Sequence, residues 1–206
     1  MPAPKAAKKP AKAAKRRPRN AAATREAILQ SARRAFAAHG YDAAGVREIA
    51  RDAGVTAMLV NRYFGSKEQL FEEVVDMTMS NRTIIMPDMP RGAKMGEYIS
   101  AGVLETTRPD MTPLDGSLMM IRSAATTHPR IADIGRRQIE KQHQRILAAA
   151  LEGENADERA ALILSLTAGV QLMRQMVGLS ALTKTPTAKL QKLLAPVIQQ
   201  LVDAKG

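Results

Sequence analysis

Residues 45–67 read GVREIARDAGVTAMLVNRYFGSK, and this stretch predicts two short helices joined by a tight turn. Apolar residues recur at helical spacing over 46–53, and Gly54 then interrupts the pattern. Gly54 allows a positive φ in the turn, and the valine after it is expected to fill the angle between the helices. Thr56 is placed to cap the second helix, over residues 57–64. Two helices joined in this way have the geometry of a helix-turn-helix.

The residues on either side extend this motif to four helices. Thr24 is predicted to cap a first helix, which Gly40 ends. Ser66 opens a fourth helix, with Gln69 three residues on as in a capping box. The positions expected to be buried in these two outer helices are Ile28, Ala32, Ala35, Phe36, Leu70, Phe71, Val74 and Val75.

The rest of the chain also has a helical pattern. Residues 84–93 contain two prolines and a glycine, which indicates a linker or a broken helix. Asn155 and Glu158 have the spacing of a further capping box. Five more helices are expected, at residues 94–107, 113–126, 129–151, 156–180 and 187–203. No stretch shows sustained strand-like alternation, so the predicted fold class is all-α with about nine helices.

Positive charge is concentrated at the N-terminus. The chain carries 31 Lys and Arg against 20 Asp and Glu, a net charge of +11, and eight of the basic residues but no acid lie in residues 1–23. This Ala-, Lys-, Pro- and Arg-rich segment has too little apolar surface to offset its ordering entropy, and we expect a disordered basic tail. Such an excess of charge indicates a polyanionic partner.

Several other classes of protein are disfavoured. The chain has no cysteine, which excludes disulfides and thiolate chemistry. No apolar run is long enough to span a bilayer and the N-terminus lacks an apolar signal core, so no membrane partner is expected. Four prolines within residues 1–23 argue against a helical transit peptide. The cytoplasm is the expected location.

The sequence shows no constellation for catalysis or metal binding. His39, His128 and His143 are scattered without the spacing of metal ligands, so a metal site is not expected. No nucleophile–base arrangement, glycine-rich phosphate loop or paired-carboxylate site is present. We therefore expect neither an enzyme nor a cofactor.

Five motifs lie in register along residues 24–68: TREAIL from Thr24, FAAHGY from Phe36, VREIA from Val46, AGVT from Ala53 and RYFGSKE from Arg62. Together they resemble the N-terminal domain of the tetracycline-repressor (TetR) family. This resemblance implies a three-helix DNA-binding domain, a fourth connecting helix and a helical domain that dimerises and binds an inducer. Residues 24–76 would form the first domain, and residues 77–206 the ligand-sensing and dimerisation domain. A weaker resemblance, to one branch of the family's C-terminal domains, rests on RAALIL from Arg159 and LLAP from Leu193.

The helix over residues 57–64 is expected to have a buried side and a DNA-facing side. Val60 and Phe64 are four residues apart and should pack against Ile49. On the opposite side, Asn61 can contact adenine in a bidentate manner, and Arg62 can contact guanine or a phosphate. The candidate DNA-binding residues are Arg47, Thr56, Ala57, Met58, Asn61, Arg62, Tyr63 and Lys67. Among these, Met58 is a candidate for packing on a thymine methyl or for simple packing within the protein.

The resemblance implies further contacts and also has exceptions. In the family, the positions of Tyr63 and Lys67 contact phosphate, and the position of Arg47 reaches a base edge or the backbone. Asn61 stands where a tyrosine is common, which suggests a different operator preference. Gly45 stands where a serine or threonine usually caps the helix and often touches phosphate.

The C-terminal half is expected to make a homodimer and to bind a small-molecule effector of unknown identity. Two copies of the reading helix should meet successive major grooves about 34–36 Å apart on a near-palindromic operator of double-stranded DNA. The last two helices would form a four-helix bundle with a second copy. Its candidate residues are Leu162, Leu166, Val170, Leu190, Leu194, Val197 and Leu201. The ligand-site candidates are Met119, Met120, Arg122, Met173 and Met176, although methionines at helical spacing are also common in cores.

The expected function is thus a ligand-released homodimeric repressor, and two other functions stay open. One is a sequence-tolerant architectural DNA-binding protein dominated by the basic tail. The other is a regulator without an inducer. The tail itself is either a solvated charge run or a flexible arm that adds phosphate or minor-groove contacts.

Overall fold

The regular elements of the structure are all helical. The computed structural model describes residues 21–79, 84–108, 119, 123, 126 and 128–204, and these contain no strand. The N-terminal helices are α1 (Ala21–Ala43), α2 (Val46–Asp52), α3 (Ala57–Phe64) and α4 (Lys67–Met79). The later elements are η1 (Gly92–Lys94), α5 (Met95–Thr106), α7 (Pro129–Ile139), η2 (Glu140–Gln144), α8 (Arg145–Ala148), α9 (Ala156–Gln171), η3 (Leu172–Met176), α10 (Ser180–Thr183) and α11 (Thr187–Asp203). The predicted all-α fold is confirmed.

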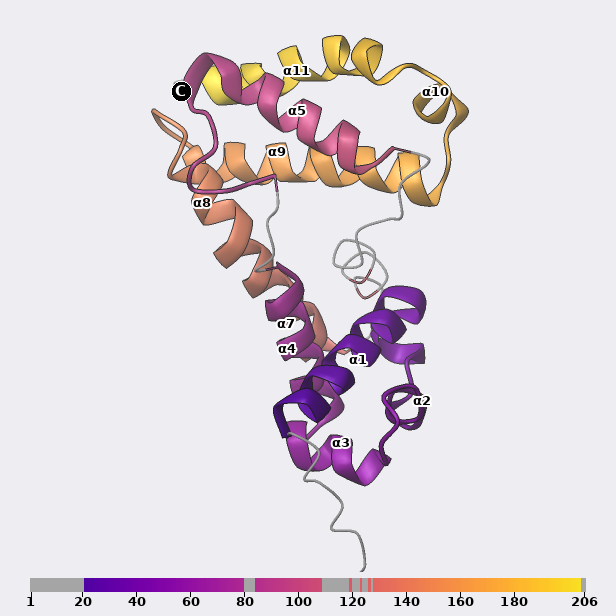
Figure 1. The fold of residues 1–206 in the computed structure, drawn as a ribbon. Helices are drawn as coiled ribbons and strands as arrows, with labels where there is room; N and C mark the ends of the chain where they lie inside the picture. The colour runs from indigo at the N-terminus through magenta and orange to yellow at the C-terminus, as the bar shows by residue number, and fades with distance from the viewer. Residues whose placement is uncertain are drawn as a thin grey trace, which may run out of the picture.

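The helices form two groups joined by a rod (Figure 1). Helices α1–α4 make one end of the molecule, and α5, α9, α10 and α11 make the other. The continuous run of α7, η2 and α8 extends from the second group down to α4. This rod therefore connects the C-terminal group of helices to the N-terminal group.

The N-terminal group is built around a cluster of aromatic side chains. Phe36 of α1 meets Phe71 of α4 edge-on, with ring centroids 5.1 Å apart, and Tyr41 meets Phe71 at 5.3 Å. Ile131 and Ile134 of α7 are buried in the same core. The apolar core thus fixes α7 to the N-terminal helices.

Helix α1 begins earlier and ends differently from a regular helix. It already includes Ala21, and Thr24 is a buried residue inside it, so the prediction that Thr24 caps the helix is wrong. Three residues that we assigned to the tail, 21–23, are helical. Gly40, with φ 71° and ψ 178°, breaks the helix as expected, and the last turn over residues 41–43 follows this kink.

The C-terminal group depends on a close approach of α5 and α11. A Cβ atom added to Gly96 would lie 2.6 Å from the backbone oxygen of Ala195 and 2.8 Å from the backbone nitrogen of Gln199. The backbone N–H of Gly96 also donates a 2.8 Å hydrogen bond to Gln199 Oε1. Only glycine lets the two helices meet at this distance.

Arg159 of α9 closes the end of α11. Its buried guanidinium donates hydrogen bonds to the backbone oxygens of Leu201 and Val202, at 3.3 and 3.1 Å, and to those of Glu152 and Glu154. The carbonyls at a helix C-terminus lack partners within the helix, and a cation there also meets the negative end of the helix dipole. This contact gives a structural reason for the arginine in the RAALIL motif.

Several predicted helix boundaries change. The helix expected over 129–151 is continuous over residues 129–148, through the π-helical turn η2, and the one expected over 156–180 ends with the π-helical turn η3 at Met176. The capping box at Asn155 is wrong, because Asn155 has φ 54° and its side chain makes no capping bond. The last helix has the predicted bounds, 187–203. The helix expected over 113–126 falls outside the described residues except at 119, 123 and 126.

Candidate nucleic-acid interface

Helices α2 and α3 are joined by a tight turn with a specific backbone shape. Gly54 has φ 67°, and the N–H of Val55 donates a 2.9 Å hydrogen bond to Ala50 O. Thr56 then caps α3, because its hydroxyl accepts a 3.3 Å hydrogen bond from the N–H of Leu59. The turn glycine and the threonine cap are both as predicted from residues 45–67.

Helix α2 is braced against α1 by polar contacts. Ser31 Oγ donates a 2.9 Å hydrogen bond to Ile49 O, and Arg34 of α1 pairs with Asp52 of α2 at 2.5 Å. The Arg34 hydrogen bond lowers the pKa of the Asp52 carboxyl. These contacts hold α2, the first helix of the helix-turn-helix, against α1. The turn after α2 then sets the position of α3.

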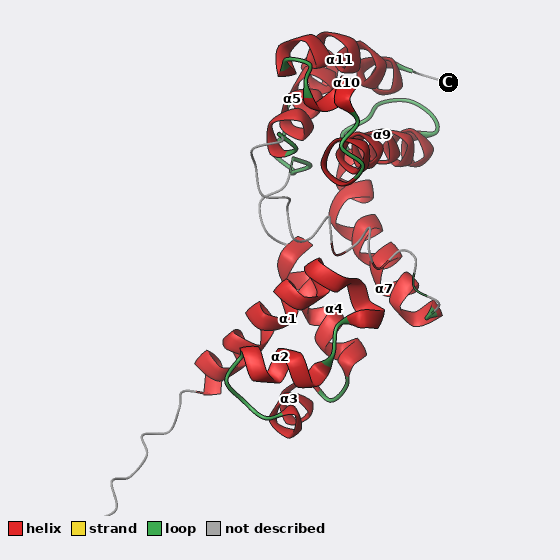
Figure 2. Cartoon of the chain, turned by 90° about the vertical axis from the view of Figure 1, so that its right-hand side faces the viewer, coloured by secondary structure: helices red, strands yellow, loops and turns green. Residues whose placement is uncertain are grey.

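Helix α3 presents one apolar and one polar side. Val60 and Phe64 are buried in the core with Ile49, as predicted. Asn61 and Arg62 are exposed, and Met58 is 80% exposed. Figure 2 shows α3 at the end of the molecule farthest from α11. The exposed side of α3 is therefore open to a long polymer such as a DNA duplex.

The other candidate DNA contacts border this side. Arg47 on α2 and Thr56 are exposed, whereas Ala57 and Tyr63 are half-buried and pack against the core. Gly45 precedes α2 with no side-chain cap, so the hydroxyl expected at this family position is missing. Its absence removes one phosphate contact that the resemblance would imply.

Lys67, at the start of α4, is held in place within the protein. Its ammonium lies 4.4 Å from the centroid of the Tyr41 ring, and Nζ donates a 3.3 Å hydrogen bond to Asp42 O. Partial burial lowers the pKa of Lys67, while Asp42 and Glu68 act in the opposite direction. Ser66 Oγ accepts a hydrogen bond from the N–H of Gln69 at 3.2 Å, the predicted cap of this helix.

The ligand-site candidates that the structure describes lie in two different places. Met119 is fully buried in the core shared by α1, α4 and α7. Met173 and Met176 lie on η3, where their side chains are about two-fifths exposed. Met120 and Arg122 lie outside the described residues. The structure shows two shallow grooves elsewhere, both beside Glu72 and Glu73 on the N-terminal helices.

The predicted dimer residues fall into two groups. Leu162 of α9 and Val197 of α11 are 55% and 46% exposed. Leu190 is buried within its own subunit, and Leu166, Val170, Leu194 and Leu201 are half-buried in the C-terminal core clusters. Leu193, which helical spacing alone did not single out, is 66% exposed. The sequence alone does not separate the exposed Leu193 from the half-buried Leu194 beside it.

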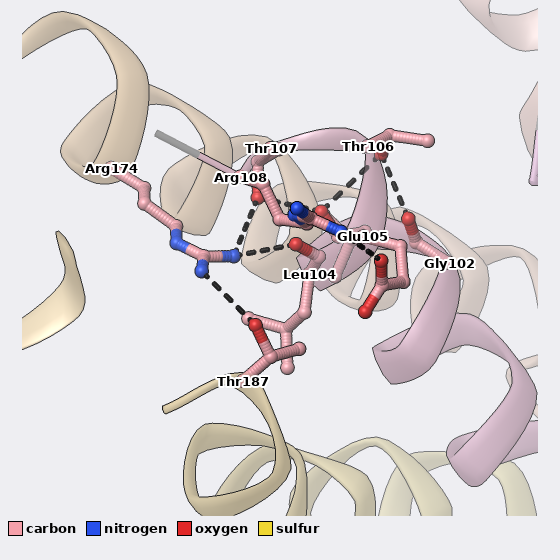
Figure 3. A network of polar contacts seen from close by, with 9 residues as sticks. Gly102, Leu104, Glu105, Thr106, Thr107, Arg108, Arg174 and Thr187 are labelled. Carbon is pink, nitrogen blue, oxygen red and sulfur yellow. Dashed lines mark hydrogen bonds and ion pairs between the residues drawn. The ribbon is translucent and has the colours of Figure 1, made fainter. Parts of the chain in front are cut away.

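A buried arginine ties three parts of the C-terminal group together (Figure 3). Arg174 Nη1 donates hydrogen bonds to Leu104 O at 2.6 Å and to Thr107 Oγ1 at 3.2 Å, at the end of α5. Its Nε donates to Leu182 O, and Nη2 donates to Thr187 Oγ1 at the start of α11. Sequence alone gave no sign that Arg174 is buried. Met173 and Met176 on the same turn are exposed, so Arg174 anchors the π-helical turn to the inside of the domain.

The described residues contain neither a metal-binding cluster nor a membrane-spanning helix. No group of three or more His, Asp or Glu side chains is arranged to hold a metal ion there. Within the same ranges, no helix is both long and apolar enough to cross a bilayer.

Comparison with known proteins identifies the class to which this arrangement belongs, a helix-turn-helix DNA-binding transcriptional regulator. Residues 28–74 match the family model for bacterial regulatory proteins of the tetR family, and residues 93–202 match the model for the tetracyclin repressor-like C-terminal domain. The second match alone covers more than half of the chain. The chain belongs to the TetR family.

One curated relative and two solved structures illustrate the extent of the similarity. The transcriptional repressor AcnR of Corynebacterium efficiens is 44% identical over 48 residues, which is 23% of this chain and 26% of AcnR, so the match spans about a quarter of that relative. A TetR-family regulator of Streptomyces coelicolor A3 is 26% identical with a TM-score of 0.57, covering 92% of this chain and 99% of that one. FadR of Bacillus subtilis, in complex with stearoyl-CoA, is 16% identical with a TM-score of 0.64, covering 86% and 97%.

Proposed function

We propose that this TetR-family DNA-binding regulator is a homodimeric repressor that a small molecule releases from its operator. The observation that carries the proposal is the set of exposed leucine and valine side chains on α9 and α11, in a chain whose α3 is exposed for DNA reading. Large exposed apolar side chains on neighbouring helices usually mark an interface with another protein.

DNA reading is assigned to the exposed side of α3. Asn61 has both an amide donor and a carbonyl acceptor for the major-groove edge of adenine, and Arg62 has the donors for guanine or a phosphate. Arg47, Tyr63 and Lys67 border this side and would add phosphate contacts, which position the protein without specifying sequence. Residues 24–76 would thus carry the operator contacts, and residues 77–206 the regulation.

Dimerisation is assigned to α9 and α11. These helices pack on each other, and Leu162, Leu193 and Val197 remain exposed in the single chain. Pairing the two helices with their copies would cover these side chains in a four-helix bundle. The closed symmetry of such a dimer also places two α3 helices on a two-fold related operator.

Ligand release is supported by the family and by one similar structure. FadR of Bacillus subtilis was solved in complex with stearoyl-CoA, and it resembles this chain over most of its length. A ligand in the C-terminal group would act through the α7 rod, whose Ile131 and Ile134 lie in the N-terminal core. Ligand and operator would then oppose each other's binding by the same factor.

The test combines a Leu193→Glu variant with operator binding. The operator is first selected from fragments of the source genome bound by the full chain. Wild type should elute as a dimer in size-exclusion chromatography with light scattering, and Leu193→Glu as a monomer whose operator affinity is lower by at least about tenfold, because buried unpaired charge at an interface is costly.

A control separates this effect from added charge alone. Ala132 is exposed on α7, so Ala132→Glu adds the same charge away from α9 and α11 and should leave the dimer intact. Circular dichroism confirms that both variants fold. If the Leu193→Glu protein is still a dimer, α9 and α11 do not form the interface.

A further inference from the structure

Asp42, at the kink of α1, contacts two parts of the chain that are far apart in sequence. Its backbone oxygen accepts the hydrogen bond from Lys67 Nζ at 3.3 Å. Its carboxylate Oδ1 accepts a 3.2 Å hydrogen bond from Thr126 Oγ1 and lies 3.4 Å from His128 Nε2. Asp42 therefore stands between the first turn of α7 and the lysine at the start of α4.

The residues before α7 are arranged to hold this contact. The backbone N–H of His128 donates a 3.2 Å hydrogen bond to Thr126 Oγ1, which orients the hydroxyl that donates to Asp42. The His128 ring also meets the Tyr41 ring edge-on, with centroids 5.7 Å apart. His128 directly precedes Pro129, the first residue of α7, so its contacts with Asp42 and Tyr41 lie at the start of the rod.

Tyr41 links the histidine to the lysine from the other side. Its ring packs against His128 on one edge and lies under the Lys67 ammonium. Burial, together with a hydrogen bond to Glu68, raises the pKa of Tyr41 to about 12. The phenol therefore stays neutral at physiological pH, and the ring remains a cation–π partner of Lys67.

We propose that Asp42 and His128 are positioning residues for DNA binding: their contact clamps the kink of α1 to the start of α7 and so holds Lys67 in place for an operator phosphate. This inference rests on the proposed role of Lys67 as a phosphate contact. The cluster links the start of α7 to the proposed DNA contact at Lys67 along the edge of the N-terminal core, to which Tyr41 belongs.

The clamp has a specific dependence on the protonation of His128. His128 contacts Asp42 and Tyr41 of α1, and Tyr41 in turn interacts with Lys67 and Glu68 of α4 and with Arg130 of α7. Of these, the carboxylate of Asp42 is in direct contact with the imidazole. A protonated imidazole forms an ion pair with Asp42 and a neutral one does not, so the clamp is stronger at low pH. Operator affinity should therefore be higher when the imidazole of His128 is protonated.

The experiment measures operator affinity of the full chain by fluorescence anisotropy at constant ionic strength. The pH ratio is the operator affinity at about pH 6 divided by the operator affinity at about pH 8. This ratio should be about two- to fivefold larger for wild type than for His128→Asn or Asp42→Asn, the range expected for an exposed ion pair. Combining both substitutions should have no further effect on this ratio. Equal ratios in wild type and both single variants would overturn the clamp.

Two controls make the result specific. His39→Asn removes an exposed histidine of α1 for which the described residues show no contact with Asp42 or His128, and it should keep the wild-type ratio. In a Lys67→Ala background, His128→Asn should no longer change the ratio, since the clamp acts through Lys67. If Asp42→Asn keeps the full ratio, His128 acts on DNA directly by its charge and the clamp is wrong.

Failure of the clamp can be told apart from failure of the proposed function. Asn61→Ala should weaken operator binding at every pH, whether or not the clamp exists. A chain that binds no selected operator, or that ignores Asn61→Ala, contradicts the proposed DNA-reading role. If Asn61→Ala weakens operator binding but wild type, His128→Asn and Asp42→Asn share one pH ratio, only the clamp is contradicted.

Discussion

Asn61 and Arg62 are adjacent on α3, exposed, and on the same side of the helix as Met58. Neither side chain is needed by the core, which Val60 and Phe64 fill from the opposite side. Substitution at these two positions should therefore change DNA binding without changing the fold. Few positions in the chain separate the two effects so well.

We expect Asn61→Ala and Arg62→Ala each to weaken operator binding by about 1–3 kcal/mol, because each removes the hydrogen bonds to one base or phosphate. Asn61→Ala should also relax the base preference at one operator position. The measurement is a titration of the selected operator and of single-base variants by fluorescence anisotropy.

Arg136→Ala on α7 serves as the charge-matched control for Arg62→Ala. Arg136 pairs with Glu140 on its own rod, far along the chain from α3, and its removal should leave operator affinity within twofold of wild type, about 0.4 kcal/mol. If Asn61→Ala and Arg62→Ala behave like this control, α3 presents a different side to the DNA.

At the scale of single residues, helix caps that depend on a few neighbouring residues were predictable from the sequence. Backbone conformations that the neighbouring residues do not determine were not. The caps at Thr56 and Ser66 were predicted because a hydroxyl and a nearby N–H define them within four residues. The prediction that Thr24 caps the first helix was wrong because the helix already begins at Ala21. Asn155 has the right spacing for a capping box but a left-handed backbone, which sequence spacing does not reveal.

Helix bounds were predictable where a proline or glycine marks them. The bounds of α11 agree with the prediction because Pro186 precedes the first turn. The π-helical turns η2 and η3 have no such marker, so a single 3.6-residue pattern was extended through both. For η3, Arg174 gives a reason. Its hydrogen bonds run to α5 and to the start of α11, and the local sequence does not specify such tertiary contacts.

The pair α5 and α11 offers a test of packing at the scale of elements. Gly96→Ala should destabilise the protein by about 1–3 kcal/mol or more, because the added methyl group meets backbone atoms of α11 that cannot rotate away. Thermal unfolding followed by circular dichroism measures the decrease in stability, at fixed protein concentration since a dimer's stability depends on it.

Gly45→Ala is the matched control for Gly96→Ala. Its new Cβ would meet only Glu48 Cβ, at 4.0 Å, and its φ of −88° suits any residue. The decrease expected there is at most about 1 kcal/mol, because alanine caps a helix less well than glycine but meets no backbone atom. If Gly96→Ala costs no more than this, α5 and α11 lie farther apart than the structure places them.

At the scale of the whole molecule, the family motifs predicted the helix-turn-helix and its place in the chain, but not the contacts that join it to the C-terminal group. The α7 rod joins the two groups of helices, and it reaches the N-terminal helices both through Ile131 and Ile134 and through His128. Sequence periodicity predicts that α7 is amphipathic without naming what it packs against. Met119 illustrates the difference, since a candidate for the ligand site is a core residue beside α1 and α4.

The last prediction concerns the eight basic residues before α1, which carry most of the net charge. Deletion of residues 1–20 keeps Ala21 and the whole of α1 as the structure describes it, so the fold and the reading side of α3 should be intact. Operator preference should then persist while affinity for nonspecific DNA falls, and the log–log salt slope should decrease by about 0.9 for every phosphate that the tail neutralises in the full chain. Titrations of operator and random duplexes at several salt concentrations give both quantities. Disappearance of operator preference along with affinity would favour the architectural function instead, because specificity carried by α3 would survive loss of the tail.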